Sequence, residues 1–429
     1  MAKKQRQKRN EKHEKRVKKL IVGSGLCAIL LIVSTYAWFI GMKTVNVSSF
    51  DVEIAVIDQL SLSLDGKKWA ETVSISKATY NDTSVVYEGN TNSWGGDGLI
   101  PMSSVGVIDP TVSRMKLFEK GSLTTTPGGY RLMASRVNNY QENSTEQDGY
   151  VAFDLFIKNL SGNEYYTEMN QLNEEAIYLT TDSAVTVAQD GEQNTGIENS
   201  VRVAFAQIGR VKATVTDQAK ITGITCATSG DVTGICDNRV AQIWEPNDTA
   251  HVQNAINWYN TSCKKRKAAT ITDTASYDGA CGTVADGTAY QTYAVSDVIN
   301  YTDQVDVYDG TAYNSYTDSI AATPTAGKLN AYDTFTDTEK NLAGVARPTF
   351  ITLAPNSITK VRLYIYIEGQ DIDNYDFASL GKKISVAFGF TKERFFDEDV
   401  NYDSTNTAVL PDDVIKNVNN RSGNTNNNG

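Results

Sequence analysis

The stretch "SITKVRLYIYIEG" (Ser357–Gly369) decides the fold class, because its side chains alternate regularly from Val361 onward. One side of this stretch carries only aliphatic residues: Val361, Leu363, Ile365 and Ile367. The other side carries Tyr364 and Tyr366. Successive side chains of a β-strand point to opposite faces of a sheet, so this period of two predicts a long strand with one face in an apolar core.

Four other stretches alternate in the same way: Gly149–Asn159, Ser200–Ile208, Lys382–Phe390 and, nearer the N-terminus, Thr44–Leu64. The composition agrees, because Asn, Asp, Thr, Ser and Gly are plentiful while blocks of helix-favouring residues are scarce. That mixture is typical of strands joined by polar turns. The sequence therefore predicts a mainly β fold, an antiparallel β-sandwich of the jelly-roll or immunoglobulin-like kind.

A hairpin is expected close to the N-terminus. Alternating leucines between Leu60 and Leu64 lead into an Asp65-Gly66 turn, a dipeptide that favours tight hairpins. The predicted partner strand is Thr72–Ser76. The strand before this hairpin is expected over 44–58, with a bulge where the alternation slips at 48–50.

Alternation weakens in the middle of the chain, which suggests a modular organisation. We expect the first part of the sandwich over 43–208, a loop-rich insertion over 209–346, the closing strands over 347–410 and a disordered tail over 411–429. Within the insertion, residues 247–260 have the spacing of an amphipathic helix, with Asp248 as its N-cap. Its apolar stripe is Val252, Ala255, Ile256 and Tyr259.

Charge is unevenly distributed along the chain. Residues 1–19 contain ten Lys and Arg side chains against Glu11 and Glu14. The whole chain has 40 basic and 51 acidic residues, so residues 20–429 retain 30 and 49 of them and a formal charge of −19. A surface of that sign repels phosphates, which argues against nucleic-acid binding.

The basic tip precedes a segment, Leu20–Met42, that is free of charged residues and long enough for a helix to span a bilayer. The positive-inside rule places the tip in the cytoplasm and everything after Met42 outside. The segment is longer than the usual core of a signal peptide, which favours a membrane anchor, yet the small residues of "STYAWF" permit cleavage between Ala37 and Trp38. Both outcomes predict export, and the choice between them stays open.

Cysteine usage agrees with export. Apart from Cys27 in the apolar segment, the cysteines form one cluster: Cys226, Cys236, Cys263 and Cys281. An even, clustered set in an oxidising compartment predicts two disulfides, of which the most local pairing joins Cys226 to Cys236 and Cys263 to Cys281. The alternative is a zinc site, but its ligands usually come in closely spaced pairs that this cluster lacks.

Little in the sequence indicates catalysis. His13 and His251 are the only histidines, which argues against a zinc hydrolase and weakens the case for a His-dependent nucleophile. We expect His251 to be a partly exposed helix residue. The acidic run after the long strand is a candidate calcium site, with solvated loop carboxylates as the alternative. Its members are Glu368, Asp371, Asp373 and Asp376. No cofactor and no enzymatic activity are predicted.

Several of these stretches resemble one family. "STYAWF" (Ser34–Phe39) at the end of an apolar segment is similar to the export signals of TasA/camelysin-like proteins of Gram-positive bacteria. "YVAFDLFIKN", "VRLYIYIEGQDID" and "ISVAFGF" resemble strands of clostridial surface proteins with such signals. The resemblance implies cleavage after Ala37 by a dedicated signal peptidase and a jelly-roll fold. Some members of the family assemble into matrix fibres by donating an N-terminal strand to a neighbouring molecule. The resemblance implies that the donated strand would lie near 38–58 in this chain.

We therefore expect a non-enzymatic structural or adhesive protein of a bacterial cell surface that self-associates into fibres. The alternative is a single-pass ectodomain, tethered by residues 20–42, that binds glycan or calcium.

Overall fold

The computed structural model describes the regions that form the folded body. They are residues 49–56, 60–75, 99–126, 129–134, 137, 146, 149–161, 164–170, 173–180, 182–189, 191–259, 267–268, 275–276, 284–290, 292–295, 307–308, 329–331, 350–374, 383–391, 401–402 and 408–409. The predicted basic tip, apolar segment, Ala37–Trp38 cleavage site and C-terminal tail lie outside these ranges, as do Cys263, Cys281 and Asp376. No helix within them is both long and apolar enough to cross a membrane.

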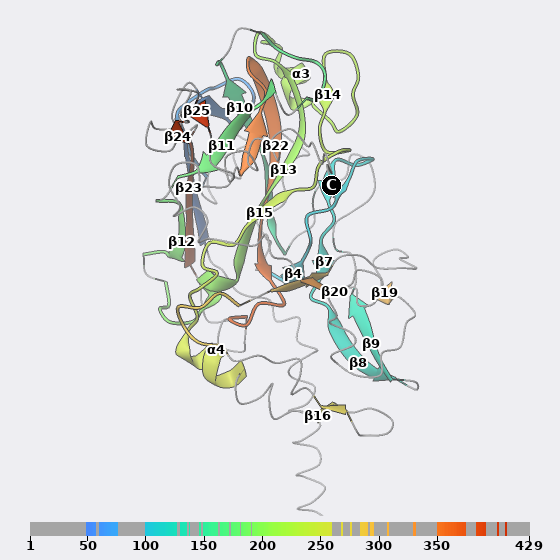
Figure 1. Ribbon diagram of the computed structural model, residues 1–429, viewed down its shortest axis with the longest axis vertical. Helices are drawn as coiled ribbons and strands as arrows, with labels where there is room; N and C mark the ends of the chain where they lie inside the picture. Colours follow the sequence, from blue (N-terminus) through green and yellow to red (C-terminus); the bar gives the residue numbers. More distant parts are fainter. Residues whose placement is uncertain are drawn as a thin grey trace, which may run out of the picture.

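The larger sheet is built around the two longest strands (Figure 1). Its order is β14 (Thr233–Gly234), β13 (Val201–Lys212), β22 (Ser357–Glu368), β10 (Val151–Asn159) and β2 (Leu60–Ser63). Three short strands extend it: β15 (Gln242–Trp244) pairs with β13, and β4 (Pro101–Ser103) pairs with both β22 and β7 (Phe118–Glu119).

The second sheet brings the first described strand, β1, beside β23 from the C-terminal part of the chain. Its order is β21 (Ile351–Leu353), β11 (Glu175–Leu179), β23 (Lys383–Thr391), β1 (Ser49–Val56) and β3 (Thr72–Ile75), and β12 (Ala184–Val187) also pairs with β23. β1 therefore lies inside the sheet, parallel to β23 on one side and antiparallel to β3 on the other.

The two sheets share one apolar core, which confirms the predicted β-sandwich. The aliphatic face of β22 packs there with residues of β1, β10, β13 and β23. Phe205 of β13 meets Phe388 and Phe390 of β23 edge-on, with ring centroids 5.1 and 5.8 Å apart. The prediction of purely antiparallel sheets is wrong, because β1 runs parallel to β23 and β4 runs parallel to β22.

A second apolar cluster covers the outer face of the larger sheet, so β22 is buried on both faces. Tyr364 and Tyr366 lie in it together with residues of the 102–117 region and of the 221–243 region. The latter region includes β14 and overlaps the end of α3 (Gln218–Thr222) and the start of β15. Much of the predicted insertion before residue 259 is thus packed on the sheet.

The remaining described elements are short. They are β5 (Ile108–Asp109), β6 (Arg114–Met115), β8 (Ser122–Thr126), β9 (Gly129–Ala134), η2 (Ile197–Ser200), α4 (Gln253–Trp258), β16 (Lys267–Ala268), β17 (Ala275–Ser276), β18 (Tyr293–Val295), β19 (Val307–Tyr308), β20 (Leu329–Ala331), β24 (Asn401–Tyr402) and β25 (Ala408–Val409). The predicted apolar stripe is buried at Ala255, Ile256 and Tyr259 and half-buried at Val252, but the helix spans only Gln253–Trp258 rather than the predicted 247–260. The predicted cap is wrong: the N-cap is Val252, with no side-chain hydrogen bond, and Asp248 is buried.

The predicted N-terminal hairpin is half right. The Asp65-Gly66 turn forms: Gly66 has a φ of +70°, and Asp65 Oδ1 accepts from the backbone N–H groups of Lys67 and Lys68 at 2.8 Å. β2, however, belongs to the larger sheet, while β3 leaves it after a single bridge between Leu62 and Ala70 and pairs with β1. The strands separate because each has an apolar face that a different sheet buries.

Candidate functional site: a buried charge cluster

Six ionisable side chains from distant parts of the chain meet where β22 ends. We call them the charge cluster: Arg202, Glu245, His251, Glu368, Asp371 and Asp373. The antiparallel register of β13 and β22 pairs Arg202 with Tyr366, which brings the guanidinium to the end of β22. Glu245 follows β15, His251 precedes α4, and the two aspartates lie in the turn after β22. The site thus depends on the sheet being complete.

Arg202 lies at the centre of the cluster and is fully buried. Its Nη2 donates to Glu245 Oε1 and, at 2.6 Å, to Asp371 Oδ2. Its Nη1 donates to the backbone carbonyls of Asn199 and Val201 at 3.0 and 3.1 Å. One guanidinium therefore binds two carboxylates and also holds the 3₁₀ turn that precedes β13.

His251 forms a second ion pair within the cluster. Its Nδ1 lies 2.7 Å from Asp373 Oδ2, and its Nε2 lies 3.1 Å from the carbonyl oxygen of Thr288. A carbonyl only accepts hydrogen bonds, so Nε2 carries a proton, and Nδ1 shares another with Asp373. Burial lowers the pKa of His251, but the hydrogen bond and negative charge of Asp373 outweigh burial and hold the pKa above its usual value.

This geometry corrects the expectation for His251, which is buried and lies before α4 rather than being a partly exposed residue of a helix. It also limits the chemistry. With both ring nitrogens engaged, His251 has no lone pair to take a proton from a nucleophile, as a Ser-His-Asp or Cys-His mechanism requires. The arrangement of the cluster can bind protons and hold elements together.

Negative charge exceeds positive charge in the cluster. Burial raises the pKa of Glu245 and of Glu368 to about 8, and the nearby Arg202 only partly offsets this. Burial likewise raises the pKa of Asp373 to about 6, with His251 opposing. Glu368 Oε1 accepts from the N–H of Gln370 at 3.0 Å, whereas its fully buried Oε2 has no hydrogen-bond partner. These carboxyl groups are therefore proton acceptors within the neutral pH range.

Three of the four predicted calcium ligands belong to this cluster, and Asp376 lies outside the described residues. Asp371 faces Arg202, Asp373 faces His251, and Asp373 Oδ1 also accepts from the N–H of Val252 at 2.9 Å. In the part of the chain that the structure describes, no group of three or more His, Cys, Asp or Glu side chains is arranged to hold a metal ion. Asp371 and Asp373 instead form ion pairs, and Glu368 accepts a hydrogen bond from the backbone of Gln370.

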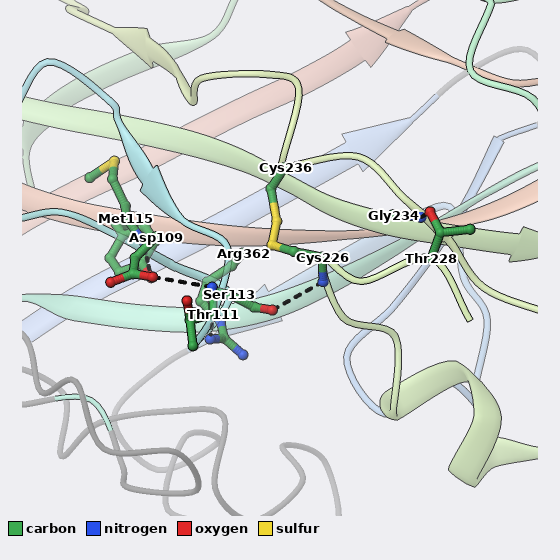
Figure 2. The surroundings of a disulfide bond; sticks show 10 residues. Asp109, Thr111, Ser113, Met115, Cys226, Thr228, Gly234, Cys236 and Arg362 are labelled. Carbon is green, nitrogen blue, oxygen red and sulfur yellow. Dashed lines mark hydrogen bonds between the residues drawn. A yellow bond between two sulfur atoms is a disulfide. The ribbon is translucent and has the colours of Figure 1, made fainter. Parts of the chain in front are cut away.

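The cysteine prediction is confirmed for one pair. Cys226 and Cys236 form a disulfide with their Cα atoms 5.2 Å apart, and Cys263 and Cys281 lie outside the described residues. Figure 2 shows this bond beside the turn at Ser113, whose Oγ accepts from the Cys226 N–H at 3.1 Å. The carbonyl of Ser113 accepts from Arg362 Nη1, also at 3.1 Å. The disulfide thus clamps the two ends of its loop together beside the outer face of the larger sheet.

Two further buried ion networks support the fold. Asp154 of β10 accepts from Arg362 of β22 at 2.7 and 3.1 Å, and Lys360 Nζ lies 3.2 Å from the same carboxylate. Glu174 binds Arg210 and Arg239. In both networks the cations outnumber the carboxylate, the reverse of the charge cluster.

Comparisons with protein-family models, with curated proteins and with solved structures found no match for this chain. Its function must therefore be inferred from its residues and their geometry.

Proposed function

We propose that this chain is a non-enzymatic structural protein of a bacterial cell surface, exported across the cytoplasmic membrane, and that it assembles into fibres by donating its N-terminal strand. The finer fold class that accompanies this proposal is a jelly-roll. Three features support the proposal: the apolar segment Leu20–Met42, the β-sandwich fold and the position of β1 within it.

The observation that carries it is the position of β1. This strand follows the apolar segment at the start of the body and occupies an interior place in a sheet, between β23 and β3. Its Val52 and Ile54 are buried in the sandwich core, with exposed fractions of 1% and 0%. All eight residues pair with β23, from Ser49 opposite Lys383 to Val56 opposite Phe390.

A strand with these properties can be supplied by a neighbour. The strand that follows β1 in sequence, β2, belongs to the other sheet. No hairpin therefore joins β1 directly to β23 or β3, its two partners in its own sheet. The same strand from a second copy would make the same backbone pairs and fill the same core positions. Repeating the exchange head to tail generates a fibre without any new contact surface.

The disulfide supports the placement outside the cell. Disulfides persist in oxidising compartments and are rare in the cytosol, where thiols are kept reduced. The Cys226–Cys236 bond lies in the body that follows Leu20–Met42, the side that the positive-inside rule assigns to the exterior. The alternative of a calcium-binding ectodomain receives less support, because the carboxylates of Asp371 and Asp373 are engaged by cations of the protein itself.

The first test is the N-terminal sequence and intact mass of the protein recovered from the surface fraction of its native cells. A mature chain that begins at Trp38 leaves β1 near a free end, as donation requires. A chain that retains the apolar segment in the membrane would leave export intact and contradict strand donation.

The second test is assembly of the mature chain, followed by light scattering and electron microscopy over a range of concentrations. Filaments should appear with rising concentration and be abolished by Ile54→Asp, which places a charge on the core face of β1. Glu53→Gln is the matched control, because Glu53 is the exposed neighbour of Ile54 on the same strand. Filaments that form equally well from the Ile54→Asp variant would refute donation.

A further inference from the structure

The charge cluster cannot be electrically balanced unless it binds protons. It contains four carboxyl groups, Glu245, Glu368, Asp371 and Asp373, against two cations, Arg202 and His251. Arg202 is ion-paired with both Glu245 and Asp371, and His251 is ion-paired with Asp373. When all four carboxyl groups are ionised, two negative charges are in excess, in a buried site where uncompensated charge is costly.

We propose that Glu245 is the proton-sensitive contact of a pH switch, which holds the segment 245–252, the segment 284–290 and Thr292 against the larger sheet while it is protonated and loosens them when it ionises. The proposal goes beyond the proposed function and is independent of export and of fibre formation, since it concerns only the described body.

Glu245 is well placed for this role. It is the first residue after β15, the short strand that pairs with β13, so it marks the point where the chain leaves the sheet. Its Oε1 accepts from Arg202 of β13 and, at 3.3 Å, from the hydroxyl of Thr292 just before β18. One carboxyl group therefore connects β13 with both segments.

The same segments are tied down at three nearby points. Asp286 accepts from the N–H of His251 at 3.1 Å, and the carbonyl of Thr288 contacts the imidazole of the same residue. The N–H of Val295 donates to the hydroxyl of Ser103 in β4 at 2.8 Å. Loss of the contact of Glu245 with Arg202 and Thr292 therefore weakens a small group of neighbouring hydrogen bonds.

Three charged side chains among the described residues act on Glu245. Arg202 attracts it, while Asp371 and Asp248 repel it. Glu368, at the end of β22, acts on the same Arg202 and is turned toward β4, where Ser103 donates a hydrogen bond to it. His251 and Asp373 form a separate pair on the α4 side. A single guanidinium thus faces three carboxyl groups and can neutralise one of them.

The direction of the pH effect follows from proton linkage. Glu245 and Glu368 have pKa values of about 8 in the folded protein against a usual value of 4.5, so the folded state holds protons that the unfolded chain releases. Their contribution is complete below pH 4.5 and is lost as the pH rises through about 8. Each group makes unfolding about 10-fold more favourable per pH unit within that window.

The test measures chemical unfolding of the full chain, solubilised in a mild detergent, at closely spaced pH values from 5 to 8. For the wild type, the logarithm of the unfolding constant should rise by about two per pH unit from these two groups. Glu245→Gln keeps the shape and neutrality of the protonated acid, so it should lower that slope by about one and leave the value at pH 5 nearly unchanged. At pH 8 the variant should unfold less than the wild type, by on the order of 100-fold.

Hydrogen exchange provides a local readout on the same samples. Segments 245–252 and 284–290 should lose protection in the wild type between pH 6 and pH 9, after correction for intrinsic exchange, and should keep it in Glu245→Gln. Glu174→Gln is the control, because Glu174 is buried to a similar degree, with an exposed fraction of 5% against 4%, but faces two arginines. That variant should be less stable throughout the pH range.

Three results would overturn the proposal. The first is a wild-type stability that stays level or rises from pH 5 to 8. The second is a Glu245→Gln variant that loses as much stability at pH 5 as Glu174→Gln does. The third is failure of both Glu245→Gln and Glu368→Gln to fold at pH 5, since neutral replacements of protonated acids should be tolerated there.

Discussion

Because β1 lies in the interior of its sheet, we predict that the substitution Ile54→Ala lowers the free energy of unfolding. Ile54 is fully buried, pairs with Phe388 of β23 on one side and with Val73 of β3 on the other, and belongs to the shared core of the two sheets. Truncation therefore removes contacts that join both layers of the sandwich.

The expected cost can be worked out from the atoms removed. The change from Ile to Ala deletes three buried carbon atoms, which at about 0.8 kcal/mol each contribute roughly 2.4 kcal/mol of lost transfer free energy. The cavity left behind adds to this, because closely packed surroundings collapse only in part. We expect the free energy of unfolding to fall by about 3–4 kcal/mol.

Urea unfolding monitored by tryptophan fluorescence provides the assay. Trp244 is buried, with its ring centroid 6.1 Å from that of Phe388, the residue opposite Ile54, so its emission reports on this part of the core. The control is Glu53→Ala on the same strand, where an exposed side chain is removed and the change should stay within about 0.5 kcal/mol. Equal effects of the two substitutions would refute the burial of β1 between β23 and β3.

Three further predictions concern the outer face of the larger sheet. Replacing Cys226 and Cys236 by Ser opens a ten-residue loop and should lower the free energy of unfolding by about 3 kcal/mol, measured by urea denaturation; an unchanged midpoint would count against the clamp. Gly234→Ala places a methyl group 1.8 Å from the carbonyl oxygen of Cys226, so the thermal midpoint should drop, and wild-type stability would contradict this close approach. Asp154→Ala leaves the buried cations Arg362 and Lys360 without their carboxylate and should lower the free energy of unfolding by about 3–5 kcal/mol. A second substitution, Arg362→Met, should restore part of that stability in the double variant. Purely additive losses would be inconsistent with an Asp154–Arg362 ion pair.

The strands could be predicted from the sequence because their signal is local. The alternation in Ser357–Gly369 locates β22, and the aliphatic side of that stretch is the side that packs in the shared core. The same period locates β10, β13 and β23 to within a few residues. Burial of Tyr364 and Tyr366 on the opposite face was not predicted, because it depends on segments that fold over the sheet from far along the chain.

The pairing of strands could not be predicted in the same way. Periodicity states which face of a strand is apolar, but it carries no information about the partner. Thr72–Ser76 was therefore predicted to pair with the adjacent Leu60–Leu64, although β3 pairs with β1 in the other sheet.

The charge cluster shows the same limit for function. The acidic residues after β22 were visible as a group, and oxygen-rich loops are typical of calcium sites. Their actual partners, Arg202 and His251, lie more than 100 residues away in sequence and reach them only through the register of β13 with β22 and through the turn before α4. One signal was available: Arg202 is a lone charge in the otherwise apolar stretch "SVRVAFAQI", and a charge in a buried strand requires a partner.

The topology also links folding to the proposed assembly. Val52 of β1 pairs with Val386 of β23, more than 300 residues further along the chain, so β1 has no sheet on its β23 side until β23 has been made and has reached it. Contacts of such separation form late, and until then the apolar face of β1 is open to pairing with another chain. A neighbour that already has its β23 in place would offer the complementary edge first. An N-terminal strand whose own partner arrives last is therefore better suited to exchange than a strand paired within a local hairpin, which supports donation by β1 rather than by β2 or β3.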